Sequence, residues 1–149
     1  MNQLDVVVLS ALEADADFNV NVLTGSDGII RGAIGGHQDT AYGASVTIVV
    51  CPLTRGRLPC IVDRVGTIVT PGKTVDVIVT EYGIAVNPAR DDLKERFIAA
   101  GLPLFLIGEL RDMVENLVGK PAPAEYDDRV VGIVTYRDGS IIDLIHQVK

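Results

Sequence analysis

Apolar residues gather in short runs along the chain, and these runs predict β-strands. Six segments have this character: Val6–Leu9, Val46–Val50, Ile61–Val62, Gly66–Thr70, Val75–Thr80 and Leu104–Leu106. Asn19–Val22 is predicted to be a strand by its alternating polar and apolar residues. A continuous apolar run, without alternating polar residues, is typical of a strand covered on both faces in a parallel sheet. The first run, Val6–Leu9, is therefore expected to be a buried strand.

Helices and one hairpin are predicted between and after these strands. Apolar spacing predicts helices near Asp39–Ala44, over Asp91–Ala100 and over Glu109–Val118. Val130–Tyr136 and Ser140–Ile145 flank the turn Arg137-Asp138-Gly139, which is a β-hairpin pattern. The order of elements predicts an α/β fold with a mixed, mostly parallel sheet. We expect residues 1–149 to form a single domain excised from a longer polypeptide, because the chain opens directly on a predicted central strand.

Composition and charge narrow the possible functions. The chain has 20 acidic and 13 basic residues, a formal net charge of −7, and its basic residues are scattered. Nucleic acid and anionic membranes are therefore poor partners, because phosphate binding needs clustered basic residues. No signal peptide opens the chain and its apolar runs are too short to cross a bilayer, so we expect a cytoplasmic protein. Cys51 and Cys60 lack histidines at metal-ligand spacing and are expected to be reduced core residues.

Three loops are candidates for ligand binding, because ligands of α/β sheets bind beyond the carboxyl ends of the strands. They are Gly35–Asp39, Thr54–Arg57 and Glu81–Gly83. Gly35 and Gly36 would let the backbone approach a ligand closely, and the helix start after them offers N–H donors to an anion or an oxyanion. Paired glycines are also common in ordinary turns, so the pattern alone leaves both interpretations open.

The side chains of these loops allow a functional and a structural interpretation. His37 could donate to a thioester or carboxylate oxygen, or it could be a loop histidine bonded to a carbonyl. Asp39 is expected to cap the helix. Glu81 is placed for acid–base or orienting chemistry, although a solvated loop glutamate fits equally well. Arg55 and Arg57 could bind a polycarboxylate or a phosphate through bidentate hydrogen bonds, or could pair with acidic residues of the protein.

Three acidic residues alternate near the start of the chain: Glu13, Asp15 and Asp17. In an extended segment they would share one face, which makes a metal site conceivable. No histidine or calcium-type loop accompanies them, so we expect them to be solvated or ion-paired and predict no metal.

Taken in order, several segments resemble the second half of CoA-transferases. Gly35-Gly36-His37-Gln38-Asp39 is similar to that family's Gly-Gly-x-x-Asp loop, and Thr80-Glu81-Tyr82-Gly83 to its Thr-Glu-x-Gly signature. Phe18-Asn19-Val20-Asn21 resembles a Gly-Asn-x-Asn-like element, with Phe18 where many members have glycine. A narrower similarity to citrate lyase alpha chains comes from four segments: Asn19–Gly28, Pro52–Pro59, Gly83–Pro88 and Tyr136–Ser140.

This resemblance implies a three-layer α/β/α fold of the glucosamine-6-phosphate deaminase and ribose-5-phosphate isomerase type. It also implies an acyl exchange in which citrate displaces acetate from an acetyl thioester on an acyl carrier subunit. The thioester would belong to CoA or to the carrier's CoA-derived prosthetic group, and no metal would be required. The implied partners are the acyl carrier and lyase subunits of an oligomeric, multi-subunit complex.

The resemblance also implies roles for individual residues. The expected catalytic residues are Gly35, Gly36 and Glu81, with the glycine backbone stabilising negative charge and Glu81 orienting the acyl group. The expected substrate-binding residues are Asn19, Asn21, His37, Arg55 and Arg57. CoA-transferases with a covalent mechanism carry a nucleophilic glutamate upstream of the segment that matches Val6–Leu9. We therefore expect the isolated chain to be folded but inactive.

Two other functions fit the same pattern. An acetyl-CoA hydrolase, or a CoA-transferase for another carboxylate, would share the Thr-Glu-x-Gly element. A non-catalytic assembly domain could use Lys94–Val118 and the terminal hairpin to hold other lyase subunits together.

Overall fold

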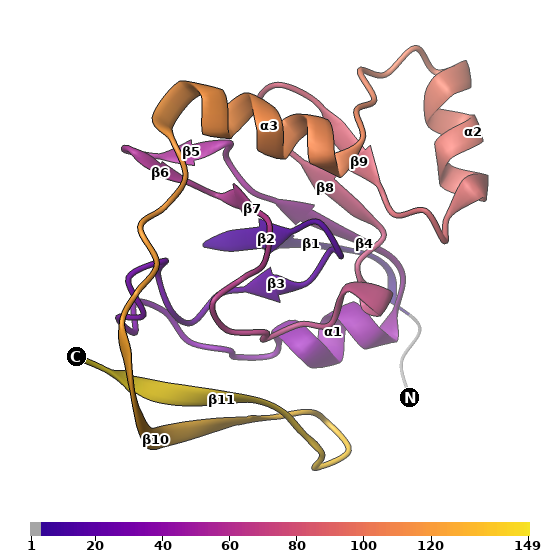
Figure 1. Ribbon diagram of the computed structural model, residues 1–149. Helices are drawn as coiled ribbons and strands as arrows, with labels where there is room; N and C mark the ends of the chain where they lie inside the picture. The colour runs from indigo at the N-terminus through magenta and orange to yellow at the C-terminus, as the bar shows by residue number, and fades with distance from the viewer. Residues whose placement is uncertain (1–3) are drawn as a thin grey trace.

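Four strands form the main sheet, in the order β1-β4-β8-β9, in the computed structural model, which describes residues 4–149 (Figure 1). β1 (Leu4–Ser10), β4 (Ala44–Val50) and β8 (Val77–Val79) are parallel, whereas β9 (Ile84–Val86) runs antiparallel to β8. The predicted α/β class with a mixed, mostly parallel sheet is confirmed.

Smaller elements surround this sheet. They are β2 (Glu13–Asp15), β3 (Val20–Asn21), α1 (His37–Gly43), β5 (Thr54–Arg55), β6 (Leu58–Pro59), β7 (Ile61–Val62), the 3-10 turn η1 (Gly72–Thr74), α2 (Asp91–Ala99), α3 (Ile107–Val118), β10 (Tyr126–Thr135) and β11 (Ile141–Val148). β3-β2-β7 form a second sheet, β5 pairs with β6, and β10 pairs with β11 in the predicted hairpin. In Figure 1 the hairpin lies at the opposite end of the molecule from α3.

The core lies on one face of the main sheet. The register aligns Val49 with Ile78 and Ile78 with Ala85, so these three side chains share that face. All three are fully buried, in one cluster with Leu110 and Val114 of α3. α3 therefore covers this face of the sheet, as the amphipathic spacing of its sequence predicts.

β1 is an edge strand, and the prediction that it is buried on both faces is wrong for this chain. Val6 and Val8 are 51% and 63% exposed. Their side chains point to the face of the sheet opposite the core, whereas Val7 and Leu9 point toward the core and are half-buried. The apolar run therefore predicted the strand correctly but not its exposure.

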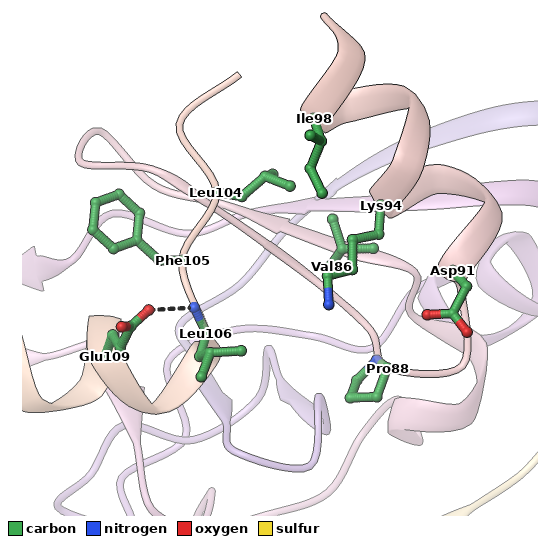
Figure 2. Close-up of a pocket in the computed structure, with 9 residues that line it drawn as sticks. All are labelled: Val86, Pro88, Asp91, Lys94, Ile98, Leu104, Phe105, Leu106 and Glu109. Carbon is green, nitrogen blue, oxygen red and sulfur yellow. Dashed lines mark hydrogen bonds between the residues drawn. The ribbon is translucent and has the colours of Figure 1, made fainter. Parts of the chain in front are cut away.

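Two other predicted strands are reduced to single bridges. Gly66–Thr70 forms no strand, and only Thr70 bridges to Val20. Leu104–Leu106 contributes one parallel bridge, from Leu104 to Ile84 at the edge of the main sheet. This segment leads into α3 and, together with α2 and β9, surrounds a groove (Figure 2).

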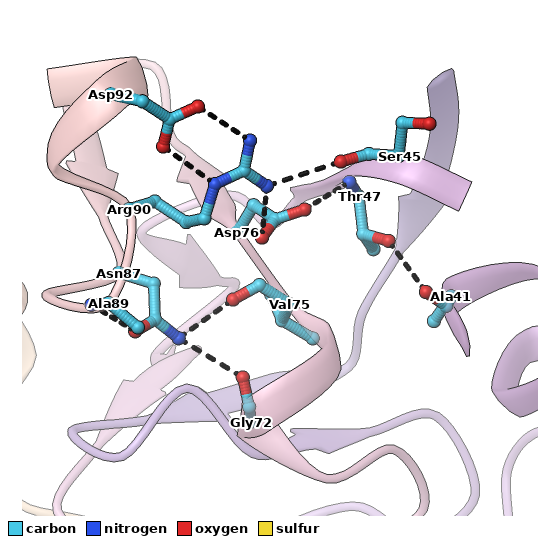
Figure 3. Close-up of polar contacts among 10 residues, drawn as sticks. All are labelled: Ala41, Ser45, Thr47, Gly72, Val75, Asp76, Asn87, Ala89, Arg90 and Asp92. Atoms are coloured by element: carbon cyan, nitrogen blue, oxygen red, sulfur yellow. Dashed lines mark hydrogen bonds and ion pairs between the residues drawn. The ribbon is translucent and has the colours of Figure 1, made fainter. Parts of the chain in front are cut away.

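A polar cluster closes the amino end of the main sheet (Figure 3). Arg90 forms an ion pair with Asp76 at 2.7 Å and a two-point contact with Asp92 at 2.8 and 3.0 Å. The hydrogen bond and charge of Arg90 lower the pKa of Asp92 to about 2. Asp76 accepts the N–H of Thr47 at 2.7 Å, and Asn87 donates to two backbone carbonyls around η1 at 3.1 and 2.8 Å. The Asn87 of the Gly83–Pro88 segment is therefore a structural residue, at the end of the sheet away from the candidate loops.

The turn between β2 and β3 contains an unusual backbone conformation. Phe18 has a φ of 64°, and it is the non-glycine residue with positive φ among the described residues. Its ring is 2% exposed and belongs to the core. Phe18 thus keeps the left-handed conformation for which glycine is the usual residue, while its side chain fills space in the interior.

Candidate functional site

The carboxyl ends of β1, β4 and β8 define one edge of the main sheet. These strands end at Ser10, Val50 and Val79, and because they are parallel their following loops leave from the same edge. Neighbouring strands lie about 4.8 Å apart, so the ends of β1 and β8 are separated by roughly 10 Å. This edge is the part of the α/β sheet where ligands usually bind.

The glycine pair lies at this edge, at the start of α1. Gly35 has a φ of 53°, and Gly36 occupies the N-cap position, so Asp39 is not the predicted cap. Both glycines are exposed, and a Cβ added at either would have no described atom within 4 Å. The backbone of this loop is therefore open to a ligand approaching from outside. Asp39 instead pairs with Arg137 of the hairpin at 3.2 Å.

His37 fixes the glycine loop to the end of β1. Its Nε2 lies 3.1 Å from the carbonyl oxygen of Ser10, and its Nδ1 lies 2.6 Å from Oγ1 of Thr70. A carbonyl only accepts, so Nε2 carries the proton and donates it, while Nδ1 accepts from the Thr70 hydroxyl. Burial lowers the pKa of His37, which favours this neutral form. Both ring nitrogens are engaged within the protein, so the geometry gives His37 a positioning role.

Glu81 follows β8 and is exposed at the same edge. Its Oε2 accepts the N–H of Leu53 at 2.8 Å. The turn is held by Thr80, whose Oγ1 accepts the N–H groups of Tyr82 and Gly83 at 3.2 and 3.1 Å. A cavity of about 400 Å³ borders Glu81, and it is lined by Val50, Cys51, Pro52, Val79, Thr80 and Glu81.

The two arginines of the β5–β6 hairpin differ in their surroundings. Arg55 donates from Nη2 to the carbonyl of Ala11 at 3.1 Å, directly after β1. It also lines a second cavity of about 190 Å³, whereas Arg57 does not; both arginines are exposed. The cavity is lined by Leu12, Glu13, Gly25, Ser26, Arg31, Arg55, Leu58, Pro59 and Cys60. Arg55 is therefore placed to meet a ligand in this cavity, and Arg57 is outside its lining.

Glu13 and Asp15 are buried, contrary to the prediction that they are solvated or ion-paired. Glu13 is 4% exposed, and burial raises its pKa above the ordinary 4.5, although hydrogen bonds from Asn21 and Ser26 oppose this. Asp15 is 1% exposed and accepts backbone N–H groups from residues 17, 19 and 65. These donors replace water, so the carboxylates can be buried without a metal or an ion pair. Asp17 alone is exposed as predicted.

Asn19 and Asn21 hold the backbone around β2 and β3, and Asn21 bonds to Glu13 in the lining of the cavity that contains Arg55. Asn21 has no exposed surface, donates to Glu13 and to Thr24, and accepts the N–H groups of residues 23 and 24. Asn19 bonds to Asp15 at 3.2 Å and accepts the N–H of Gly72 at 2.9 Å. We therefore revise the expected role of both asparagines from substrate contact to positioning.

Hydrogen bonds tie three of these side chains to backbone positions that lie close to one another in the sequence. Glu81 bonds to Leu53, two residues before Arg55, and Arg55 bonds to Ala11, next to the Ser10 carbonyl that meets His37. The glycine pair and Glu81 share the carboxyl edge, but each cavity described above contains only part of the set. Sequence reasoning did not assign Ser26 or Glu13 to a cavity, although Ser26 lies in the Asn19–Gly28 segment and Glu13 in the alternating acidic series.

Within residues 4–149, no three His, Cys, Asp or Glu side chains come together in a way that could hold a metal ion. In that range no helix has the length and apolar content to cross a membrane. Cys51 and Cys60 are both buried and are not joined by a disulfide, and their burial confirms their predicted place in the core.

Comparison with known proteins places the chain in a family. The model of the family described as citrate lyase, alpha subunit, matches residues 1–148. The citrate lyase alpha chain of Klebsiella pneumoniae is 62% identical over 147 residues, and that of Escherichia coli K12 is 58% identical over 149 residues. The matches cover 99% and 100% of this chain but 29% of each relative, so the chain spans less than a third of their length.

One solved structure extends this likeness to three dimensions. A crystal structure from Streptococcus mutans, described as the alpha subunit of citrate lyase in complex with citrate, matches with a TM-score of 0.96 and 54% identity. The match covers 98% of this chain and 29% of that one. Since the family model spans nearly every residue and the fold agrees closely, the chain belongs to the citrate lyase alpha subunit family.

Proposed function

We propose that the full-length protein exchanges acyl groups between citrate and an acetyl thioester. The family match over residues 1–148 carries this proposal, and it favours citrate-lyase-type transfer over the hydrolase and the other transferases. A citrate carboxylate would attack the thioester carbonyl and release the thiolate, leaving a mixed anhydride. The thiolate would then attack the citryl carbonyl, giving the citryl thioester and free acetate.

Residues at the carboxyl edge can support each part of this reaction. Negative charge develops on the thioester oxygen, and the open backbone at Gly35 and Gly36 can approach that oxygen closely. Glu81 would orient the acyl group from its position on the Leu53 N–H. Arg55 would hold a citrate carboxylate in the cavity beside Ser26. Glu81 and Arg55 are each already held by a hydrogen bond to the backbone.

The thioester would belong to CoA or to the CoA-derived group of an acyl carrier subunit. The carrier and a lyase subunit are the proposed partners, in an oligomeric complex located in the cytoplasm. We also propose that the complete domain has the three-layer α/β/α arrangement of CoA-transferases and is part of a longer polypeptide, to which these 149 residues contribute. The chain alone is then expected to fold without catalysing transfer.

The two arginines provide a matched test in the full-length protein. Arg55→Ala is expected to raise KM for citrate about tenfold or more, because it removes a charged hydrogen bond to substrate. Arg57→Ala removes the same charge from the same hairpin, two residues away, and is expected to change KM little. Glu81→Gln is expected to lower kcat by roughly 100-fold. Equal effects of the two arginine changes, or an unchanged rate in Glu81→Gln, would contradict these roles.

A separate experiment on the unchanged full-length protein tests which carboxylic acid accepts the acyl group. Initial rates with citrate, succinate and butyrate are expected to favour citrate strongly. A preference for either of the other two acids would point to a different carboxylate, and release of acetate without any acceptor would indicate a hydrolase. Binding of the carrier subunit without any transfer of acetyl would instead support an assembly domain.

A further inference from the structure

The two cysteines of the chain border different cavities of the candidate site. Cys51 lines the cavity beside Glu81, and Cys60 lines the cavity that contains Arg55. The sulfur of Cys51 lies 3.7 Å from the carbonyl oxygen of Cys60, so the two residues are in direct contact. The sequence has no third cysteine, and these two are not joined by a disulfide. The chain therefore contains one pair of free thiols, with one member at each cavity.

The β5–β6 hairpin keeps the two cysteines together. They flank its paired strands, and the N–H of Cys60 donates to the carbonyl of Leu53 at 3.0 Å. On the other side, the N–H of Ala14 in β2 donates to the carbonyl of Cys60 at 2.8 Å. The backbone at residue 60 is thus held against both neighbouring segments, and the Cys51 sulfur stays beside it. Two groups held in this way react with each other far faster than groups that must meet by diffusion.

Arg55 gives the two thiols different chemistry. Its Nη2 donates to the carbonyl of Ala11 at 3.1 Å, and the Cys51 sulfur lies 4.0 Å from the same oxygen. Hydrogen bonding from Cys51, together with the charge and hydrogen bond of Arg55, lowers the pKa of Cys60 against the opposing effect of burial. The contact with Cys60 and burial raise the pKa of Cys51. Because the thiolate is the nucleophilic form, Cys60 is the attacking thiol of the pair.

The Arg55 cavity gives small molecules a route to Cys60. The residue itself is 1% exposed, and the cavity that it lines has a volume of about 190 Å³. A water molecule takes up roughly 30 Å³ in the liquid, and hydrogen peroxide has one more oxygen atom than water. The cavity therefore has room for a small peroxide beside the Cys60 sulfur.

We propose that Cys60 and Cys51 form a thiol pair that a hydroperoxide oxidises to a disulfide. The Cys60 thiolate attacks one oxygen of hydrogen peroxide, the O–O bond breaks and hydroxide leaves, so that Cys60 becomes a sulfenic acid. The Cys51 sulfur then attacks the Cys60 sulfur, gives up its proton and expels the hydroxyl group as water. With the proton that Cys60 released on ionising, two thiols and one peroxide give one disulfide and two waters.

The disulfide would act on both cavities of the candidate site. It would close residues 51–60 into a ring that contains Arg55, and it would draw the Cys51 sulfur away from the Ala11 carbonyl that Arg55 also contacts. Oxidation is therefore expected to raise KM for citrate several-fold, and dithiothreitol is expected to reverse the change. This effect on citrate rests on the proposed function, whereas the oxidation of the thiol pair does not.

Mass spectrometry of the oxidised full-length protein tests the pair directly. Trypsin cleavage after Arg55 and Arg57 places the two cysteines on separate peptides, 32–55 and 58–64. The protein is treated with hydrogen peroxide, its remaining thiols are blocked, and it is digested without reductant. The two peptides are expected to appear joined, increasingly with time, and to separate after treatment with dithiothreitol. Absence of the joined peptides, in samples whose methionines are oxidised, would overturn the proposal without the use of any variant.

Two serine variants assign the attacking and the resolving thiol. In Cys51→Ser the sulfenic acid at Cys60 has no partner, and we expect it to accumulate and to be trapped there by dimedone. In Cys60→Ser the thiol at position 51 is expected to give about tenfold less dimedone adduct or lower still, because it remains protonated. Equal adduct at the two positions, or more at Cys51, would overturn the assignment.

The two arginines again provide a matched pair of variants. Arg55→Ala is expected to slow formation of the joined peptides, because it removes the positive charge beside Cys60. Arg57→Ala removes a charge that does not line the cavity, and the rate of oxidation is expected to match that of the parent. Equal rates in the two variants would show that Arg55 does not activate Cys60 and would overturn this part of the proposal. The peptide masses do not depend on acyl transfer, so failure of the proposed function would appear only in the kinetics.

Discussion

Replacement of Phe18 by glycine and by alanine is expected to reverse the usual order of these two residues. In most positions alanine is the more stabilising of the pair, because glycine loses more backbone freedom on folding. Phe18 has a φ of 64°, in the left-handed region that disfavours every residue with a Cβ. Glycine at this position should therefore give the more stable protein.

The magnitude follows from three contributions: the lost ring, the backbone strain and the flexibility of glycine. Phe18 is 2% exposed, and removal of a buried phenyl ring costs roughly 3–5 kcal/mol in either variant. The left-handed conformation destabilises a residue with a Cβ by roughly 1–2 kcal/mol, and glycine relieves this strain. Glycine also loses more backbone entropy on folding, which offsets roughly 0.5–1 kcal/mol of that relief. Phe18→Gly should thus lose roughly 2–4 kcal/mol against the parent chain, and Phe18→Ala roughly 0.5–1 kcal/mol more.

Urea unfolding at 25 °C, followed by far-UV circular dichroism, measures both differences. If the unfolding free energy has the same slope against urea concentration in the three proteins, differences between their urea midpoints report differences in stability. An alanine variant as stable as the glycine variant, or more stable, would refute the reasoning, since the backbone at position 18 would then carry no strain. A glycine variant more stable than the parent would show that the ring contributes little to the core.

Three further predictions concern the same region. Glu13→Gln should raise the melting temperature at pH 7 and lose this gain below about pH 4.5, because burial raises the Glu13 pKa and the ionised form costs stability only above its unfolded value. His37 has a lowered pKa, so its contribution to the stability of the fold is complete above pH 6.5 and falls as the pH drops below that value. Between pH 6.5 and 5 the melting temperature of His37→Gln should therefore decline less than that of the parent chain. Gly83→Ala should lower kcat and the melting temperature together, because the added Cβ would lie 2.3 Å from the Phe105 ring and shift the turn that carries Glu81. A variant with the kcat and melting temperature of the parent would show that the turn tolerates the change.

The candidate site shows why motifs alone misjudge individual roles. Glu81 and the glycine pair were predicted for the carboxyl edge, and the structure places them there. Asn21 belongs to an equally suggestive motif, yet it is fully buried and holds a turn. Arg55 and Arg57 have the same chemistry two residues apart and are both exposed, yet only Arg55, which pairs with Leu58 in the β5–β6 hairpin, lines the cavity.

The sequence by itself determined the α/β class, the parallel strands β1, β4 and β8 of the main sheet, the helices α2 and α3, the terminal hairpin and the family resemblance, whereas β9 was not predicted. Periodicity and turn residues are local, so neighbouring positions suffice to specify these features. The tertiary structure alone decided which polar groups are buried and which apolar groups are exposed. Asp15 is buried because the N–H of Val65 reaches it from 50 residues away, and Asn19 is fixed by the N–H of Gly72. Val8 is exposed because the elements of residues 4–149 pack on the other face of its sheet. Burial is set by segments distant in sequence, and only the folded chain brings them together.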